Sequence, residues 1–167
     1  MNGSGMVILG NGIKAERLPA PGSTPFDQPA PGVFESIYQA LDASSQERIG
    51  PSRPRLLVIP IRDDDGAVAG GFWGCTNFQW LRVQMLFIPE ALRGRRVGTG
   101  LMATAEREAQ ARGCRGAIVD TLSFKAGPFY RKIGYELFGV LEDCPPGYNQ
   151  LYLSKRFDRA GALGTPN

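Results

Sequence analysis

The sequence predicts a mixed α/β fold, and three observations carry the prediction. Residues 80–88 (WLRVQMLFI) and 117–122 (AIVDTL) are mostly apolar runs typical of buried strands, and the helical run 99–112 between them ends at Gly113. Strand, helix and strand in this order form a βαβ unit, in which the strands are parallel and the crossover is right-handed. Residues 63–66 (DDDG) lie between two further strand-like runs and are typical of a β-hairpin with a type I′ turn.

The N-terminal part is predicted to contain little regular structure. Residues 6–9 are an apolar run that predicts a first strand, whereas 16–32 and 44–54 are predicted loops. Residues 10–15 match the GxGxxA spacing of dinucleotide-binding turns, but five prolines between positions 19 and 31 exclude the helix that must follow such a turn. Residues 33–43 predict an amphipathic helix because four side chains recur at helical spacing: Phe34, Ile37, Tyr38 and Leu41.

The remaining elements follow from the same local patterns. Four strands and one short helix are predicted, in chain order: strands over 55–62 and 67–76, a helix over 126–133, and strands over 135–141 and 150–155. Pro128 near the start of the short helix and Gly134 after its end support its limits. Residues 157–167 are expected to form a frayed tail. The length of 167 residues predicts a single domain that spans residues 1–167.

Composition narrows the classes of function. The net charge is +3, and the basic residues are scattered except at Arg93, Arg95 and Arg96, so we expect no nucleic-acid partner. The chain has three widely spaced cysteines and no histidine, which disfavours a metal site or a disulfide framework and fits a cytoplasmic location. It shows neither a signal peptide nor an apolar stretch of membrane-spanning length, so we expect no membrane partner.

The turn at residues 93–100 (RGRRVGTG) has the features of an anion site. It joins an apolar strand to a helix, and the first N–H groups of a helix lack internal partners while its N-terminus is partially positive. Glycines allow a phosphate to approach the backbone, and three arginines in four positions add cationic donors. The alternative interpretation is a basic surface turn that caps a helix. A P-loop is excluded because no Gly-Lys-Ser/Thr follows the glycines.

This turn resembles the phosphate loop of the GNAT superfamily of N-acetyltransferases, which reads Gln/Arg-x-x-Gly-x-Gly/Ala. Two registers fit: one starts at Arg95 and ends at Gly100, and the other, which we prefer, starts at Arg93 and ends at Gly98. In the preferred register Arg96 stands where the first glycine is expected. A residue other than glycine is tolerated there if its φ is negative, which is the conformation we expect for Arg96.

A second segment, residues 123–135 (SFKAGPFYRKIGY), is similar to the other GNAT signature, Asn-x-x-Ala-x-x-(Phe/Leu)-Tyr followed by Gly-(Phe/Tyr). Five residues match at the expected spacing: Ala126, Phe129, Tyr130, Gly134 and Tyr135. With two motifs in the right order, the chain is identified as a member of this superfamily. The resemblance implies a twisted mixed sheet of about 6–7 strands flanked by helices, with a V-shaped splay between strands 80–88 and 117–122.

The resemblance also implies acetyl-CoA as the acetyl donor. The pantetheine arm would pair with the backbone of Leu86, Phe87 and Ile88, whose N–H and C=O groups the splay leaves unpaired. The diphosphate would bind the turn formed by Arg93, Gly94, Arg95, Arg96, Val97, Gly98 and Thr99. Ser123 takes the place of the motif's Asn as a shorter polar group, and Phe129 would pack against the cofactor.

For catalysis, the resemblance places Tyr130 near the thioester sulfur as general acid and a backbone N–H of residues 86–88 at the oxyanion. The general base is less clear, because Gln84 occupies the position where many relatives carry Glu or Asp. Glutamine can hold a water but cannot accept a proton. Three other carboxylates are candidates, namely Glu35, Glu90 and Asp120, and an acceptor amine of low pKa would need no strong base. Four aromatic residues are candidates for the acceptor pocket: Phe72, Trp73, Trp80 and Tyr148.

The leading functional hypothesis is an N-acetyltransferase that moves an acetyl group from acetyl-CoA directly to a primary amine of a small molecule or peptide. Its rival is a non-catalytic acyl-CoA-binding protein on the same fold, suggested by Gln84 and Ser123. Dimers are frequent among similar proteins, so a homodimer is one expected assembly.

Overall fold

The computed structural model describes residues 7–9, 13–15, 31–124 and 126–157. The chain divides into two compact units, Met1–Gly50 and Pro51–Asn167, and each is described by itself. The prediction of a single domain stays a prediction. Of the expected tail, residues 158–167 lie outside the described residues, whereas the Phe157 N–H donates to the Arg115 carbonyl at 2.9 Å.

In the first unit, two short strands and one helix are described. β1 (Val7–Leu9) pairs antiparallel with β2 (Ile13–Ala15), whereas the predicted loop over 16–32 lies almost wholly outside the described residues. α1 (Val33–Ile49) is longer than the predicted 33–43, so the prediction of a loop from residue 44 is wrong. Residues 44–49 (SSQERI) contain no Gly or Pro to stop the helix, and Gly50, with φ 76°, ends it.

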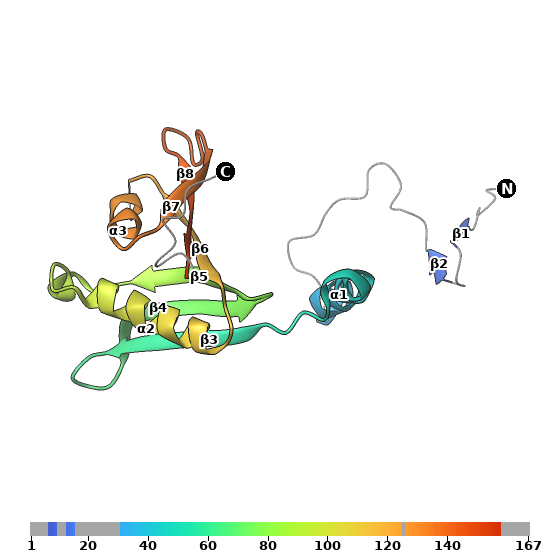
Figure 1. Ribbon diagram of the computed structural model, residues 1–167, viewed down its shortest axis with the longest axis horizontal. Helices are drawn as coiled ribbons and strands as arrows, with labels where there is room; N and C mark the ends of the chain where they lie inside the picture. Colours follow the sequence, from blue (N-terminus) through green and yellow to red (C-terminus); the bar gives the residue numbers. More distant parts are fainter. Residues whose placement is uncertain (1–6, 10–12, 16–30, 125, 158–167) are drawn as a thin grey trace, which may run out of the picture. The chain divides into compact units, whose positions relative to one another are not determined.

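The second unit is built on a six-stranded mixed sheet, as the sequence predicted (Figure 1). The strand order is β3-β4-β5-β6-β8-β7, in which β5 and β6 are parallel and every other neighbouring pair is antiparallel. The strands have these bounds: β3 Arg55–Arg62, β4 Val68–Asn77, β5 Trp80–Phe87, β6 Gly116–Leu122, β7 Glu136–Leu141 and β8 Gln150–Arg156.

Three helical segments connect these strands. A short 3-10 turn, η1 (Glu90–Leu92), follows β5, α2 (Val97–Ala111) joins β5 to β6, and α3 (Gly127–Lys132) joins β6 to β7. α2 lies over β3, β4 and β5 (Figure 1). The predicted close packing of its alanines is confirmed, because Ala105 and Ala109 are fully buried in the core. None of the described helices is both long and apolar enough to cross a membrane.

The β3–β4 hairpin is present, but its turn is not of type I′. That type needs positive φ at both central residues, whereas Gly66 is the one residue of 63–66 with positive φ, at 83°. Two backbone hydrogen bonds close the turn, from the Gly66 N–H to the Asp63 carbonyl and from the Asp63 N–H to the Ala67 carbonyl, both at 3.0 Å. The Asp63 Oδ1 supports this turn by accepting the N–H groups of Asp65 at 3.1 Å and Ala67 at 2.8 Å.

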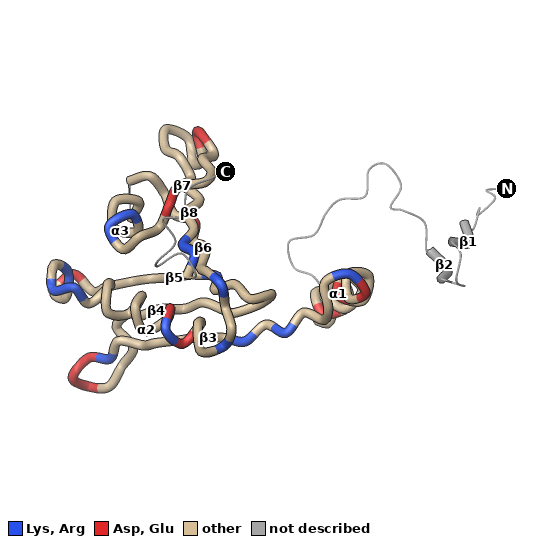
Figure 2. The backbone as a smooth tube through the Cα atoms, in the orientation of Figure 1, with Lys and Arg blue, Asp and Glu red and all other residues tan. Residues whose placement is uncertain are grey.

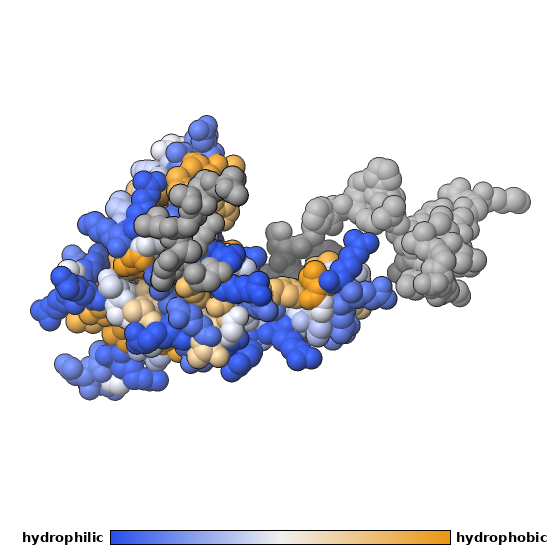
Figure 3. All heavy atoms as spheres, in the orientation of Figure 1, coloured by the Kyte–Doolittle hydropathy of each residue, from blue (hydrophilic) through white to orange (hydrophobic). Residues whose placement is uncertain are grey.

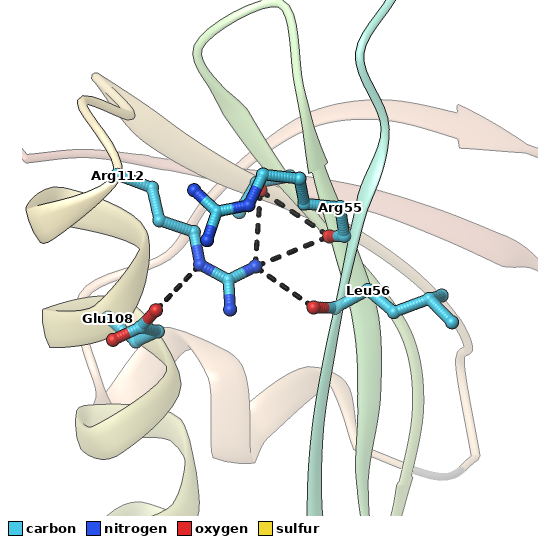
Figure 4. A network of polar contacts seen from close by, with 5 residues as sticks. Arg55, Leu56, Glu108 and Arg112 are labelled. Carbon is cyan, nitrogen blue, oxygen red and sulfur yellow. Dashed lines mark hydrogen bonds and ion pairs between the residues drawn. The ribbon is translucent and has the colours of Figure 1, made fainter.

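A polar network fastens the end of α2 to the sheet (Figure 4). Arg112 donates to the carbonyls of Arg55 at 3.3 Å and Leu56 at 3.0 Å on β3, and its Nε donates to Glu108 at 2.7 Å. The Arg112 side chain is 14% exposed, so these contacts are partly shielded from water. The network holds α2 on the sheet near the C-terminal end of the helix.

Candidate active site

The parallel strands β5 and β6 separate partway along their length. Their paired residues run from Trp80 opposite Gly116 to Val83 opposite Val119, where the pairing ends. β5 continues to Phe87 and β6 to Leu122, so the backbone of each strand is unpaired with the other beyond that point. The predicted V-shaped splay between these strands is confirmed.

A β-bulge lies at the point where the splay begins. Across β4 and β5, Gly74 pairs with Val83 and Trp73 with Met85, so Gln84 is an extra residue on β5. The bulge places Gln84 and Met85 both in exposed positions, and the inward alternation resumes at the half-buried Leu86. A bulge redirects side chains and increases strand twist, which is what a widening gap requires.

A pocket of about 460 Å³ occupies the opening of the splay. Residues of β5 and β6 face each other across it, and α3, together with Gln150 at the start of β8, completes it. It brings together four predicted site residues: Gln84, Leu86, Phe87 and Tyr130. Asp120 also lines it, and the amide of Gln150 donates a hydrogen bond to that carboxylate. The pocket therefore holds a phenol, amides and a carboxylate that different elements contribute.

Tyr130 is buried and lines this pocket. Its side chain is 4% exposed, and its ring lies edge-on to Phe129 at 5.1 Å and to Tyr135 at 5.5 Å between ring centroids. Burial, with a smaller contribution from the negative charge of Asp120, raises the pKa of Tyr130 to about 12. The phenol therefore keeps its proton near neutral pH and is available as a proton donor.

A second, smaller cavity of about 260 Å³ lies at the turn that follows β5. Six of the seven predicted diphosphate-binding residues line it, together with Ile88 and Phe129, whereas Arg95 is exposed and does not. A Cβ built at Gly98 would lie 3.4 Å from the Phe129 ring, so this ring packs directly on the turn. Arg93 is folded back, with its Nε donating to the Ile88 carbonyl at 3.1 Å.

Arg96 adopts the left-handed conformation, with φ 61°, so the expectation of a negative φ at this position is wrong. The position requires the geometry that glycine supplies most easily, and Arg96 supplies it with backbone strain instead. It is also the residue that precedes α2, and its side chain makes no capping hydrogen bond. The first N–H groups of α2 therefore remain suited to an anion.

Figure 2 shows basic positions gathered at the turn after β5 and acidic positions at the β3–β4 hairpin. In Figure 3 hydrophilic side chains cover both loops, with hydrophobic side chains between them. The cationic surface at the α2 N-terminus is local, and it coincides with the cavity that the glycines leave open. Among the described residues, no group of His, Cys, Asp and Glu could hold a metal ion.

Ser123 has a structural partner. Its Oγ accepts the N–H of Asn149 at 3.1 Å, and its own N–H donates to the Asn149 carbonyl at 2.8 Å. These bonds join the end of β6 to the residue before β8. Its predicted contact with the cofactor stays a prediction.

Two of the three candidate bases belong to the second unit. Asp120 lines the splay pocket, whereas Glu90 is an exposed residue of η1 that does not line it. The four candidate acceptor aromatics do not line the splay pocket: Phe72 is buried in the core, Trp73 is on β4, Trp80 contacts Arg156, and Tyr148 packs on Phe124. The sequence analysis missed Gln150 because no local motif marks a residue that reaches the site through the β6–β8 pairing.

The second unit thus combines a mixed sheet that splays between two parallel strands with an uncapped basic helix N-terminus beside the gap. The family model "Acetyltransferase (GNAT) domain" matches residues 55–137. An acetyltransferase of Agrobacterium fabrum is 42% identical over 123 residues, which cover 74% of this chain and 90% of that protein. The chain belongs to the GNAT acetyltransferase family.

Two further similarities extend this result. The blasticidin-S acetyltransferase of Streptomyces morookaense is 40% identical over 125 residues, covering 74% of this chain and 92% of that protein. A crystal structure from Agrobacterium tumefaciens superposes with a TM-score of 0.74 at 40% identity, covering 80% of this chain and 98% of that one.

Proposed function

We propose that the protein is an acetyl-CoA-dependent N-acetyltransferase that moves an acetyl group directly to a primary amine of a small molecule or peptide. One observation carries the proposal. The splay between β5 and β6 holds Tyr130 and Asp120 in one pocket, and the strand that lines this pocket leads directly into the basic turn before α2.

The residues present fit acetyl-CoA. The uncapped N-terminus of α2, with Arg93 and Arg96, offers N–H and guanidinium donors for a diphosphate. The unpaired backbone of Leu86, Phe87 and Ile88 would hold the pantetheine arm as an additional strand does. An aminoglycoside 6′-N-acetyltransferase of the same fold, 16% identical with a TM-score of 0.54, was crystallised with coenzyme A.

When bound, acetyl-CoA supplies a thioester carbonyl that an amine can attack. Tyr130 donates a proton to the departing sulfur, which its raised pKa allows because the phenol is still protonated at neutral pH. A backbone N–H of residues 86–88 stabilises the developing oxyanion. Gln84 cannot accept a proton, and its amide orients the acceptor or a water at the bulge.

We infer a small-molecule amine as the first acceptor class to examine. The blasticidin-S acetyltransferase is similar over nearly its whole length, so blasticidin S is the first acceptor to test on this chain. Simple primary amines and short peptides complete the panel.

The experiment measures both halves of the proposal. Isothermal titration with acetyl-CoA and with coenzyme A compares the wild type with an Arg93→Ala/Arg95→Ala/Arg96→Ala triple variant. We expect wild-type binding that weakens about tenfold or more in the triple variant, because charged hydrogen bonds to the diphosphate are lost. Release of the coenzyme A thiol with the amine panel then measures transfer.

The two hypotheses of the sequence analysis give different results. Tight acetyl-CoA binding without thiol release on any amine would favour the non-catalytic acyl-CoA-binding protein. A folded wild type that does not bind acetyl-CoA would overturn the proposed function altogether.

A further inference from the structure

A pocket of about 350 Å³ lies beside the splay and is separate from the cofactor turn. Its lining includes Arg82 on β5, Phe138 on β7 and Tyr152 on β8. Val83, Gln84, Val119 and Asp120 line both this pocket and the splay pocket, so the two meet where the β5–β6 pairing ends. A molecule in this pocket therefore lies next to the position where the acetyl group is transferred.

The sheet register explains why these side chains meet. Asp120 on β6 is directly opposite Tyr152 on β8, and paired residues project from the same face of a sheet. This face is not the core face, because the neighbours Val119 and Leu153 are the buried ones. Phe138 is the extra residue of a β7 bulge, between Leu137 opposite Leu153 and Gly139 opposite Tyr152. Both Gln84 and Phe138 are therefore aimed into the pocket by bulges.

The carboxylate of Asp120 is oriented but not neutralised. The Gln150 amide that donates to it carries no charge. The two ion pairs among the described residues, Arg112 with Glu108 and Lys155 with Glu106, do not include Asp120. Arg82 lines the same pocket without forming an ion pair with it. The pocket thus presents a negative charge that is available to a cationic ligand.

An exposed aromatic pair lies beside this carboxylate. Phe138 is 63% and Tyr152 is 36% exposed, and their ring centroids are 6.3 Å apart with the planes inclined at 51°. Aromatic faces attract organic cations and cover flat apolar groups, and large exposed aromatics together mark an interaction site. A carboxylate next to such a pair is chemically suited to an ammonium that carries a flat ring.

We propose that this pocket is the acceptor subsite, and that its substrate is a primary ammonium carried on a flat ring system, which Asp120 binds and deprotonates. The proposal rests on the proposed function and names its substrate class. Asp120 is then a catalytic residue, because it contacts the reacting amine, whereas Phe138 and Tyr152 determine specificity. Arg82 contributes a positive charge to the same pocket, so a polyamine with several cations is disfavoured.

The proton balance is complete without another reactant. Asp120 takes one proton from the ammonium, and the freed lone pair forms the C–N bond at the thioester carbonyl carbon. The C–S bond breaks, and the sulfur takes the proton of Tyr130. The second proton of the nitrogen restores the Tyr130 hydroxyl, and Asp120 releases its proton to water. One ammonium and one thioester give one amide, one thiol and one proton.

The test uses steady-state kinetics of the full chain with three probe amines: 2-phenylethylamine, n-hexylamine and spermine. We expect the wild type to favour 2-phenylethylamine over n-hexylamine by about tenfold in kcat/KM, because only the first amine carries a ring. In Asp120→Asn, kcat/KM for every amine should fall about 100-fold or more, with partial recovery in Asp120→Glu. In Phe138→Ala, the preference for the ring should disappear, because kcat/KM for 2-phenylethylamine falls to about the value for n-hexylamine.

Controls separate this inference from the proposed function. Glu142→Gln removes an exposed carboxylate outside both pockets and should leave the kinetics unchanged. Acetyl-CoA binding by isothermal titration should be the same in Asp120→Asn as in the wild type, which shows an intact donor site. A wild type without transfer to any amine contradicts the proposed function itself.

An active wild type whose kcat/KM is unchanged in Asp120→Asn overturns the role of Asp120. An unchanged ring preference in Phe138→Ala overturns the substrate class. If Phe138→Ala instead lowers the molar mass measured by light scattering and leaves amine kinetics unchanged, the aromatic pair belongs to an interface between two copies, and the acceptor assignment is wrong.

Discussion

The turn before α2 and the pocket beside the splay are both polar, but they are constructed in different ways. The turn consists of consecutive residues, and its anion-binding capacity comes from the local backbone and three nearby arginines. The pocket combines residues of β5, β6, β7 and β8, which the sheet register and two bulges bring together. The turn therefore depends on its own sequence, whereas the pocket depends on how the strands of the sheet are paired.

The donor half and the acceptor half of the reaction can therefore be altered at different places in the molecule. Substitutions in the turn are expected to change affinity for the acetyl donor and to leave acceptor preference intact. Substitutions that move the strands are expected to disturb the acceptor site first, because its residues meet across four strands. If the two regions are separable in this way, substitutions in one should leave the property that the other controls unchanged.

Tyr130→Phe should lower kcat about 100-fold or more while leaving the acetyl-CoA dissociation constant nearly unchanged, because it removes one proton donor from a buried ring. Thiol release and isothermal titration measure the two quantities. Tyr148→Phe, which alters an exposed ring on Phe124, is the matched control. A loss of acetyl-CoA affinity equal to the loss of kcat would show that the phenol serves binding rather than chemistry.

Lys155→Met should lower the free energy of unfolding by about 2–3 kcal/mol, because it leaves the buried Glu106 carboxylate without its ion-pair partner. The Lys155 side chain is partly exposed, so the loss is smaller than for a fully buried pair. The pair joins α2 to β8 at 2.6 Å, so it supports the strand that carries Tyr152. Urea denaturation measures the change. The double variant Lys155→Met/Glu106→Gln should recover part of the loss, and no recovery would contradict a role for the unpaired charge.

Arg93→Ala should weaken acetyl-CoA binding about tenfold, whereas Arg95→Ala should weaken it less than about threefold, because Arg93 lines the cavity of the turn and Arg95 does not. Isothermal titration in low salt compares the two. Neither variant should change the relative kcat/KM of two acceptor amines. An altered acceptor preference in Arg93→Ala would show that the turn and the pocket are coupled.

Arg96→Gly should raise the free energy of unfolding by about 0.5 kcal/mol. Glycine removes the strain of the left-handed conformation, and this gain in free energy is larger than the cost of the extra conformational entropy that glycine gives the unfolded chain. Arg96→Ala is the control, because it removes the same guanidinium and keeps the positive φ. Both variants should bind acetyl-CoA more weakly than the wild type. Equal stability of the two variants would contradict strain at this position.

The rate should show no loss from ionisation of Tyr130 between about pH 7 and pH 10, because burial and the charge of Asp120 raise the pKa of this phenol to about 12. A raised pKa favours the protonated form, so the phenol loses its proton only in strong alkali. Ultraviolet absorbance of the phenolate measures the pH of this ionisation, and the part of the signal that is absent in Tyr130→Phe belongs to Tyr130. Asp120→Asn should move that transition to lower pH, and an unchanged transition would contradict their proximity.

Much of the fold could be predicted because it depends on local patterns. The βαβ unit, the hairpin and the splay follow from apolar runs, a helical run and the resemblance of two motifs. The length of α1 was missed because residues 44–49 show no clear apolar period, although they contain no helix breaker either. The turn type was misassigned because the pair Asp65-Gly66 suits more than one turn, and here Gly66 alone takes a positive φ.

Only part of the site could be predicted, because only part of it depends on local patterns. Motifs, or fixed spacing from a motif, mark the residues of the turn, Tyr130 and Gln84. Asp120 was one of three candidate bases, because the sequence does not show which carboxylate the strands bring to the splay. Phe138 and Tyr152 were not predicted, since the β7 bulge and the β6–β8 register bring them to the pocket, and neither can be read from the local sequence. The positive φ of Arg96 was missed because, in a sequence, a glycine is the residue that indicates a left-handed conformation, and an arginine does not.

The bulge at Gln84 also determines how β5 would respond to a change in chain length. Without Gln84, Val83 would still pair with Gly74 and Met85 with Trp73, with no extra residue between them. The strand would then alternate regularly, Val83 and Leu86 would keep their inward positions, and the local twist that a bulge adds would be lost. Deletion of Gln84 should therefore preserve the core contacts of β5 while it narrows the opening between β5 and β6.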